Sequence, residues 1–279
     1  RGFNQQHLTE KLNEQEGLPV SRSTVRRILI NEGIGSPRKR RAPKHRSRRE
    51  RYPREGMLLQ TDGSNHDWLE GRGPKLCLIG AIDDATSTVP SALFQEQETT
   101  EGYMRVFQKI VLEQGIPQAM YHDKHSIFEV AKDKQPTLEE QLEGKKPLTQ
   151  MGRLLHELGI TSIAANSPQA KGRVERLWGT FQDRLTSELR LAGARTLEEA
   201  NQVVAAFLPV YNRIFAVTAR EPEIAYRKVD KDFQAEKYFC FKYPRTVGHD
   251  NVVRFGEVRL QVLPTTDRSS YARCKVELQ

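Results

Sequence analysis

Several features are scarce or missing in the 279-residue chain. It has no run of about 18 apolar residues, which a membrane-spanning helix would need, and no stretch typical of a secretion signal. Its three cysteines, Cys77, Cys240 and Cys274, are too few and too far apart for a disulfide framework or a zinc pattern. We therefore expect no membrane partner and a reducing, cytoplasmic location. The chain begins at Arg1 without a Met, so we also expect an upstream part to be missing.

The apolar share of 37% is low for one compact domain, and the length predicts two or three domains. The net charge of +8 is concentrated in residues 36–55, which contain ten lysines and arginines and two acids. Three prolines there exclude a long helix. This basic strap (residues 36–55) predicts a contact with the phosphate backbone of nucleic acid, the alternative being a solvated linker. The cations proposed for DNA binding are Arg38, Lys39, Arg40, Arg41, Lys44, Arg46, Arg48 and Arg49.

Two short helical patterns precede the strap. The first places Leu8 and Leu12 on one face. The second begins after a possible N-cap at Ser21 and ends near Gly33. Its apolar stripe consists of Val25, Ile28 and Leu29, and its opposite face carries Arg22, Ser23, Arg26 and Arg27. The pair predicts a partial helix-turn-helix in residues 1–35 with 22–31 as the DNA-reading helix, although many ordinary helical hairpins look similar.

The central region, residues 56–215, alternates between strand and helix patterns. Three strands are followed by a helix, a strand, a helix, a strand and two long helices, and a polar insertion is expected at 129–148. This order predicts a mixed five-stranded sheet with helices on its faces, as in the α/β ribonuclease-H-like fold. The expected strands are 57–61, 75–83, 88–95, 117–123 and 160–165.

The last part, residues 216–279, is expected to be a linker followed by a small all-β barrel. Alternation is clear in "EVRLQVLP", and a hairpin turn is expected near His249–Asn251. The predicted protein is therefore multidomain.

Three acids fall at the ends of these elements. Asp62 is expected to end the first strand just before a bend at Gly63, Asp123 ends the fourth strand, and Glu175 lies beside the apolar stripe of a helix that starts at Ser167. The fold order makes strands one and four neighbours, so the three carboxylates should converge. Their mutual repulsion would be relieved by two Mg²⁺ ions, which suit phosphodiester cleavage or transfer. Each acid alone has an ordinary explanation as a turn, loop or helix-surface residue, and His122 with His125 gives only a weak zinc signal.

Three segments carry a resemblance to a known family. The stretches "LLQTDGSNHDWLEGRGPKLCLIGAIDDATS", "YHDKHSIF" and "ANSPQAKGRVERLWGTFQDRL" closely resemble the DDE transposases of the integrase superfamily, in particular the ISNCY insertion-sequence group. The resemblance implies catalytic and metal-binding roles for Asp62, Asp123 and Glu175, with Mg²⁺ or Mn²⁺, cleavage at transposon ends and strand transfer. It also implies a helix-turn-helix before the core, a β-barrel after it, and a place on the bacterial nucleoid.

Some relatives carry a Lys or Arg seven residues after the Glu, where this chain has Gln182. Lys171, Arg173 or Arg184 would then supply the phosphate contact. Joining two DNA ends suggests a homodimer or higher oligomer on double-stranded DNA. Two alternatives stay open: a catalytically silent DNA-binding regulator or relic, and a ribonuclease-H-like nuclease that cuts without joining.

Four further residues have less certain roles. Asp83 and Asp84 are expected to serve turns and caps at the end of the second strand. Trp68 and Trp178 could stack on DNA bases, but the position of Trp178 on the apolar stripe favours the core.

Overall fold

The structure is a computed structural model that describes residues 2–35, 49–130, 147–165 and 172–279. It divides into two compact units, Arg1–Asp230 and Lys231–Gln279. Most of the predicted insertion and the basic strap up to residue 48 lie outside the described residues. None of the described helices is both long enough and apolar enough to cross a membrane.

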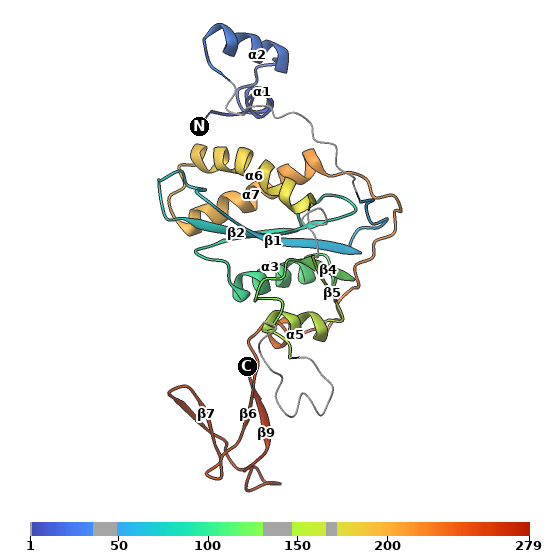
Figure 1. Cartoon of the computed structure of the whole chain (residues 1–279), viewed down its shortest axis with the longest axis vertical. Coiled ribbons are helices and arrows are strands. Elements are labelled where there is room, and N and C mark those ends of the chain that lie inside the picture. The colour runs from blue at the N-terminus through green and yellow to red at the C-terminus, as the bar shows by residue number, and fades with distance from the viewer. Residues whose placement is uncertain (1, 36–48, 131–146, 166–171) are drawn as a thin grey trace. The chain divides into compact units, whose positions relative to one another are not determined.

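The first unit is built on a five-stranded sheet in the order β3-β2-β1-β4-β5 (Figure 1). β1 pairs antiparallel with β2, and β2 pairs antiparallel with β3, whereas β4 runs parallel to β1, and β5 runs parallel to β4. β2 is buried at every position because its run of apolar residues faces helices on both sides. The predicted mixed sheet is confirmed. The strands are β1 (Leu58–His66), β2 (Leu76–Asp83), β3 (Ser91–Gln95), β4 (Ala119–His122) and β5 (Thr161–Ala164).

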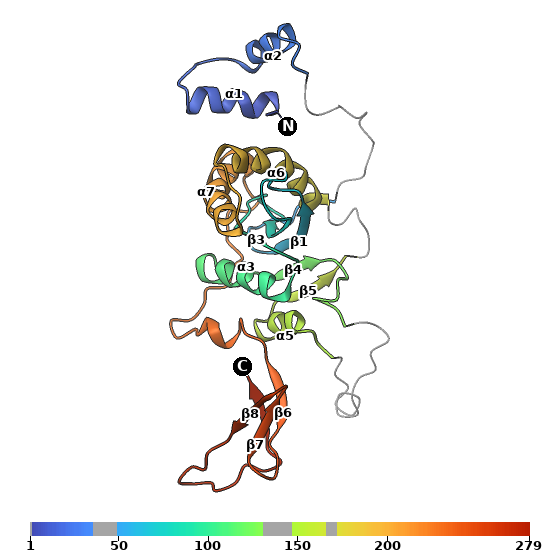
Figure 2. The ribbon, with the colours of Figure 1, turned by 90° about the vertical axis from the view of Figure 1, so that its left-hand side faces the viewer.

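Helices cover both faces of this sheet (Figure 2). α3 (Thr100–Glu113) and α5 (Gln150–Glu157) lie on one face, and α6 (Gly172–Leu191) and α7 (Leu197–Phe215) lie on the other. The largest apolar cluster fills the space between the sheet and α6 and α7, where the aromatic rings of Trp68, Phe94 and Phe181 are fully buried. This order of strands and helices agrees with the one predicted for the ribonuclease-H-like fold.

The predicted end of the first strand was wrong. β1 does not end at Asp62, because β2 continues to pair with it as far as His66 opposite Leu76. Gly63 therefore lies inside a strand rather than at a bend. Within the described residues α6 begins at Gly172, and the expected start at Ser167 lies outside them.

The two predicted N-terminal helices are present as α1 (Gln5–Glu14) and α2 (Arg22–Asn31). The Ser21 hydroxyl accepts a hydrogen bond from the Thr24 N–H and caps α2, as expected. Gly33 follows the helix with φ +70°, a conformation that favours glycine. Val25 is buried, but Ile28 is 51% exposed, so the predicted apolar stripe is only partly covered.

The second unit consists of two separate two-stranded sheets. β6 (Tyr243–Thr246) pairs with β9 (Lys275–Leu278), and β7 (Val252–Phe255) pairs with β8 (Val258–Gln261). The chain does turn at residues 249–251, as predicted, but β6 and β7 on either side of this turn do not pair with each other. The hairpin is formed instead by β7 and β8, with its turn at Gly256. Residues 231–279, all of which are described, show no closed barrel, in contrast to the prediction. Too few apolar side chains are buried there to fill a barrel interior.

Candidate functional site

Asp62 and Asp123 lie on neighbouring parallel strands. β1 and β4 pair in a register that places Gln60 opposite Tyr121. Continuing this register by two residues places Asp62 opposite Asp123, which directly follows β4. Both acids are half-buried. The sheet therefore brings together two acids that are separated by about sixty residues of sequence.

Glu175 lies in the first turn of α6, which packs over the same end of β1. The Trp178 indole N–H donates a hydrogen bond of 3.2 Å to Oδ2 of Asp62. Because residues three apart on a helix are neighbours, Glu175 lies one turn from this contact. Trp178 itself is 6% exposed, so it belongs to the core and orients the Asp62 carboxylate.

The three acids do not form a metal cage in the described part of the chain. Within the described part of the chain, no three His, Cys, Asp or Glu side chains are gathered closely enough to hold a metal ion. The Glu175 side chain is exposed at the start of its helix. All donors in the set are carboxylate oxygens, which fit the preference of Mg²⁺ and Mn²⁺. The chemistry of the donor set therefore fits the expected metal.

A fourth acid, Glu98, lies beside the site and was missed by the sequence analysis. A Cβ atom at Gly63 would lie 2.6 Å from the Glu98 carboxyl carbon, so only glycine leaves room for this carboxylate on β1. The Tyr103 hydroxyl donates a hydrogen bond of 2.6 Å to Glu98. Burial raises the pKa of Tyr103 well above its usual value, and the charges of Glu98, Asp62 and Asp123 raise this pKa further. The close packing over Gly63 could not be foreseen from a residue 35 positions away in sequence.

His122, which directly precedes Asp123, has a structural role. His122 is 1% exposed, and its ring stacks on Phe128 with the ring centroids 4.3 Å apart. Its Nε2 is 2.8 Å from the Ser162 hydroxyl, and its Nδ1 is 2.5 Å from the Asp123 carbonyl oxygen. Both ring nitrogens are therefore engaged, and His122 is not presented as a zinc ligand.

The residues predicted to contact DNA fall into three groups. The residues on the outer face of α2, Arg22, Ser23, Arg26 and Arg27, are all exposed, as a DNA-reading face requires. Lys171 and the strap cations from Arg38 to Arg48 lie outside the described residues. The third group differs from the prediction, because internal ion pairs occupy its arginines. Arg49 and Arg173 bind Asp84, and Arg184, only 7% exposed, binds Glu10.

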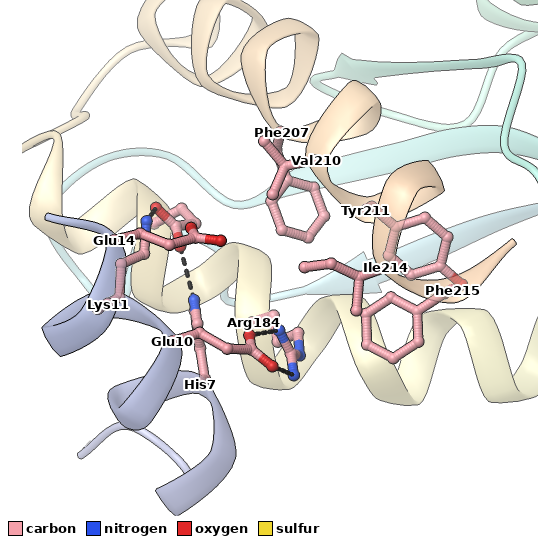
Figure 3. Close-up of a pocket in the computed structure, with 11 residues that line it drawn as sticks. His7, Glu10, Lys11, Glu14, Arg184, Phe207, Val210, Tyr211, Ile214 and Phe215 are labelled. Carbon is pink, nitrogen blue, oxygen red and sulfur yellow. Dashed lines mark hydrogen bonds and ion pairs between the residues drawn. The ribbon is translucent and has the colours of Figure 1, made fainter. Parts of the chain in front are cut away.

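Arg184 belongs to a polar contact between α1 and α6 that borders a small hollow (Figure 3). Both carboxylate oxygens of Glu10 accept hydrogen bonds from the Arg184 guanidinium, at 2.5 and 3.2 Å. Glu188 on α6 pairs with His7 at 2.6 Å and with Lys11 at 2.8 Å. The hollow contains none of the three candidate acids, so it is separate from the candidate site.

Comparisons of sequence indicate what the chain is similar to. It is 38% identical over 256 residues to the putative transposase y4bF of Sinorhizobium fredii, which covers 91% of this chain and 54% of that protein. The chain is therefore similar in sequence to a transposase. It is also 34% identical over 241 residues to the transposase for insertion sequence IS1202 of Streptococcus pneumoniae, covering 75% of this chain and 50% of that protein. The chain thus spans about half the length of these curated relatives. No protein-family model matches it.

The likeness of the chain to solved structures is weaker. The HTLV-2 integrase catalytic core domain in complex with magnesium is 17% identical, with a TM-score of 0.37, covering 54% of this chain and 84% of that one. A TM-score this low carries no argument, and the strand order and register define the core instead.

Proposed function

We propose that this chain is the DNA-binding and catalytic part of a DDE transposase. It cleaves DNA at transposon ends and transfers the freed 3′-hydroxyl strand into target DNA. The observation that carries the proposal is the register of β1 and β4, which places Gln60 opposite Tyr121 and, continued by two residues, would align Asp62 with Asp123. The helix that bears Glu175 contacts Asp62 through Trp178. The sequence similarity to two transposases supports the same conclusion.

Asp62, Asp123 and Glu175 would together hold two Mg²⁺ or Mn²⁺ ions. When bound, such ions supply activation of the attacking oxygen and stabilisation of the leaving oxygen in an in-line displacement at phosphorus. The chain's own residues set the positions of these acids. Asp62 lies within β1, Asp123 directly follows β4, and the Trp178 N–H donates a hydrogen bond to the Asp62 carboxylate.

Double-stranded DNA, both transposon end and target, is the proposed partner. The exposed basic face of α2 and the cations of the basic strap would contact phosphates, a sequence-independent term that weakens as salt rises. Acting on two ends requires a homodimer or a higher oligomer on DNA. The proposed place of action is the bacterial nucleoid in the cytoplasm.

Strand transfer with the Asp62→Asn variant tests the proposal. Loss of a metal ligand should lower Mg²⁺-dependent cleavage and joining of end-containing DNA by at least about a hundredfold. Changing a group that only positions a ligand already costs up to about a hundredfold, and losing the ligand itself should cost no less. Glu113→Gln, an exposed acid on α3, is the matched control and should retain activity. Full activity of Asp62→Asn would show that the assignment is wrong.

A catalytically silent DNA-binding regulator is the first alternative. Tight DNA binding with no cleavage in Mg²⁺ or Mn²⁺ would support it. Analysis of the products for joined strands would separate a transposase from a ribonuclease-H-like nuclease that only cuts.

A further inference from the structure

Asp84, at the end of β2, is fully buried and accepts four hydrogen bonds. Its Oδ1 accepts from Arg49 Nη2 at 2.5 Å, from Arg173 Nε at 2.6 Å and from Gln60 Nε2 at 2.7 Å. Its Oδ2 accepts from the Tyr52 N–H at 2.9 Å. A buried carboxylate is tolerated only when it is paired and hydrogen-bonded in this way. Asp84 was predicted to serve a turn or a cap, but its hydrogen bonds join separate segments of the chain. Asp83 does stabilise the turn, because it accepts hydrogen bonds from the N–H groups of Ala85 and Thr86.

Two of these bonds lead to the start of α6. Arg173 is in the first turn of that helix, two residues before Glu175. Gln60 links Asp84 to the backbone of α6, because its side-chain oxygen accepts a hydrogen bond of 3.4 Å from the Val174 N–H. The first N–H groups of a helix have no partner within the helix, so this contact supports the backbone at that point. Asp84 thus holds the backbone on the N-terminal side of Glu175 both directly and through Gln60.

The other two bonds lead to the end of the basic strap. Arg49 and Tyr52 both bind the Asp84 side chain. Arg51 adds hydrogen bonds to the Asp84 carbonyl at 3.0 Å and to the Ser87 hydroxyl at 2.8 Å. The two segments also touch each other, because Arg173 Nη2 donates to the Arg49 carbonyl at 3.3 Å. The buried Asp84 carboxylate therefore binds both the end of the basic strap and the helix that carries Glu175.

We propose that Asp84 is a positioning residue for Glu175, acting through Arg173 and Gln60, and that the end of the basic strap shares this anchor. The role of Glu175 itself rests on the proposed function. Neutralising Asp84 should therefore make the first turn of α6 open more often. Asp84 has this effect although it contacts neither DNA nor the reacting atoms. Loss of the Arg49 contact alone leaves the Arg173 and Gln60 bonds in place and has a smaller effect.

Amide hydrogen exchange in the free protein tests the anchor without any assay of activity. In Asp84→Asn, exchange at residues 172–177 should accelerate at least about tenfold relative to wild type, because the free energy needed for local opening of this turn falls. Asp83→Asn is the matched control. Asp83 is also fully buried at the end of β2, but its partners are Gly56, Ala85 and Thr86 and not α6. Exchange at 172–177 should stay within about twofold of wild type in this control.

A second variant covers the case in which Asp84→Asn does not fold. Arg173→Gln removes the link from the helix side and should also accelerate exchange at 172–177, whereas Arg49→Ala should do so less. Wild-type exchange in Arg173→Gln, or equal acceleration in the Asp83 and Asp84 variants, would overturn the inference.

Mn²⁺ titration followed by the electron paramagnetic resonance of free Mn²⁺ adds a readout that a purely structural role would not move. Asp84→Asn should weaken Mn²⁺ binding by about 10–100-fold, the usual cost of losing a group that positions a ligand, and Asp83→Asn should not. Unchanged Mn²⁺ affinity in Asp84→Asn contradicts the positioning role. If the wild-type protein cuts no DNA, the proposed function fails, while the exchange comparison still decides whether Asp84 anchors α6.

Discussion

β2 and β8 show how differently the two units of this chain are stabilised. β2, in the first unit, is buried at all eight positions. β8, in the second unit, is exposed at all four. β2 is stabilised by apolar packing against helices on both faces of its sheet. β8 is stabilised mainly by backbone hydrogen bonds to β7. The residues proposed for chemistry all lie in the first unit, where the scaffold is rigid enough to fix carboxylates.

Truncation of one apolar side chain in each unit gives the sharpest contrast. Phe181→Ala removes a fully buried ring on α6 and should lower the free energy of unfolding by about 3–5 kcal/mol. Leu260→Ala in β8, where the side chain is 44% exposed, should change it by no more than about 0.5 kcal/mol. Urea unfolding monitored by circular dichroism measures both, and similar losses would refute the contrast.

DNA affinity should also divide unequally between the units. Neutralising Arg38, Lys39, Arg40 and Arg41 should reduce the slope of log K against log salt by about 3–4, since each lost phosphate contact contributes about 0.9. The matched control neutralises Arg254 and Arg259, which lie opposite each other in β7 and β8, and should reduce the slope less. Fluorescence anisotropy at several salt concentrations gives the slopes. An unchanged slope in the first variant would rule out the strap as a phosphate contact.

Acid sensitivity offers a smaller test of the same contrast. Hydrogen bonds from Arg190 hold the pKa of Glu70 at about 2, below its usual 4.5. Because this pKa is depressed in the folded state, the stabilisation is complete above about pH 4.5 and disappears as the pH falls towards 2. After allowance for screening by solvent, Glu70→Gln should cost about 1–2 kcal/mol near neutral pH and little at pH 2.

The matched acid in the second unit is Glu277, which pairs with Lys242 at 3.7 Å and is 45% exposed. Glu277→Gln should leave the pH dependence of stability unchanged, because exposed pairs contribute little. Thermal unfolding between pH 2 and 7 checks both variants, and equal pH profiles for the Glu70 variant and wild type would contradict the assignment.

The sequence predicted the core well because its signals were local. Apolar runs located all five strands to within a few residues, and the neighbouring β1 and β4 followed from the order of elements. The barrel was predicted from alternation in "EVRLQVLP" and was wrong, because alternation indicates a strand but not what covers its apolar side. The end of β1 was placed too early, because a polar residue inside a strand looks like a turn until its pairing partner is known.

The sequence by itself determined the residue types of the candidate site, the charge of the basic strap and the order of strands and helices. These depend on composition and on spacing along the chain. Only the tertiary structure decided that Glu98 packs over Gly63, that Trp178 binds Asp62, and that Asp84 joins Arg49 to Arg173. Such contacts join side chains from 35 to 116 residues apart. They depend on the approach of packed elements, which no local pattern specifies.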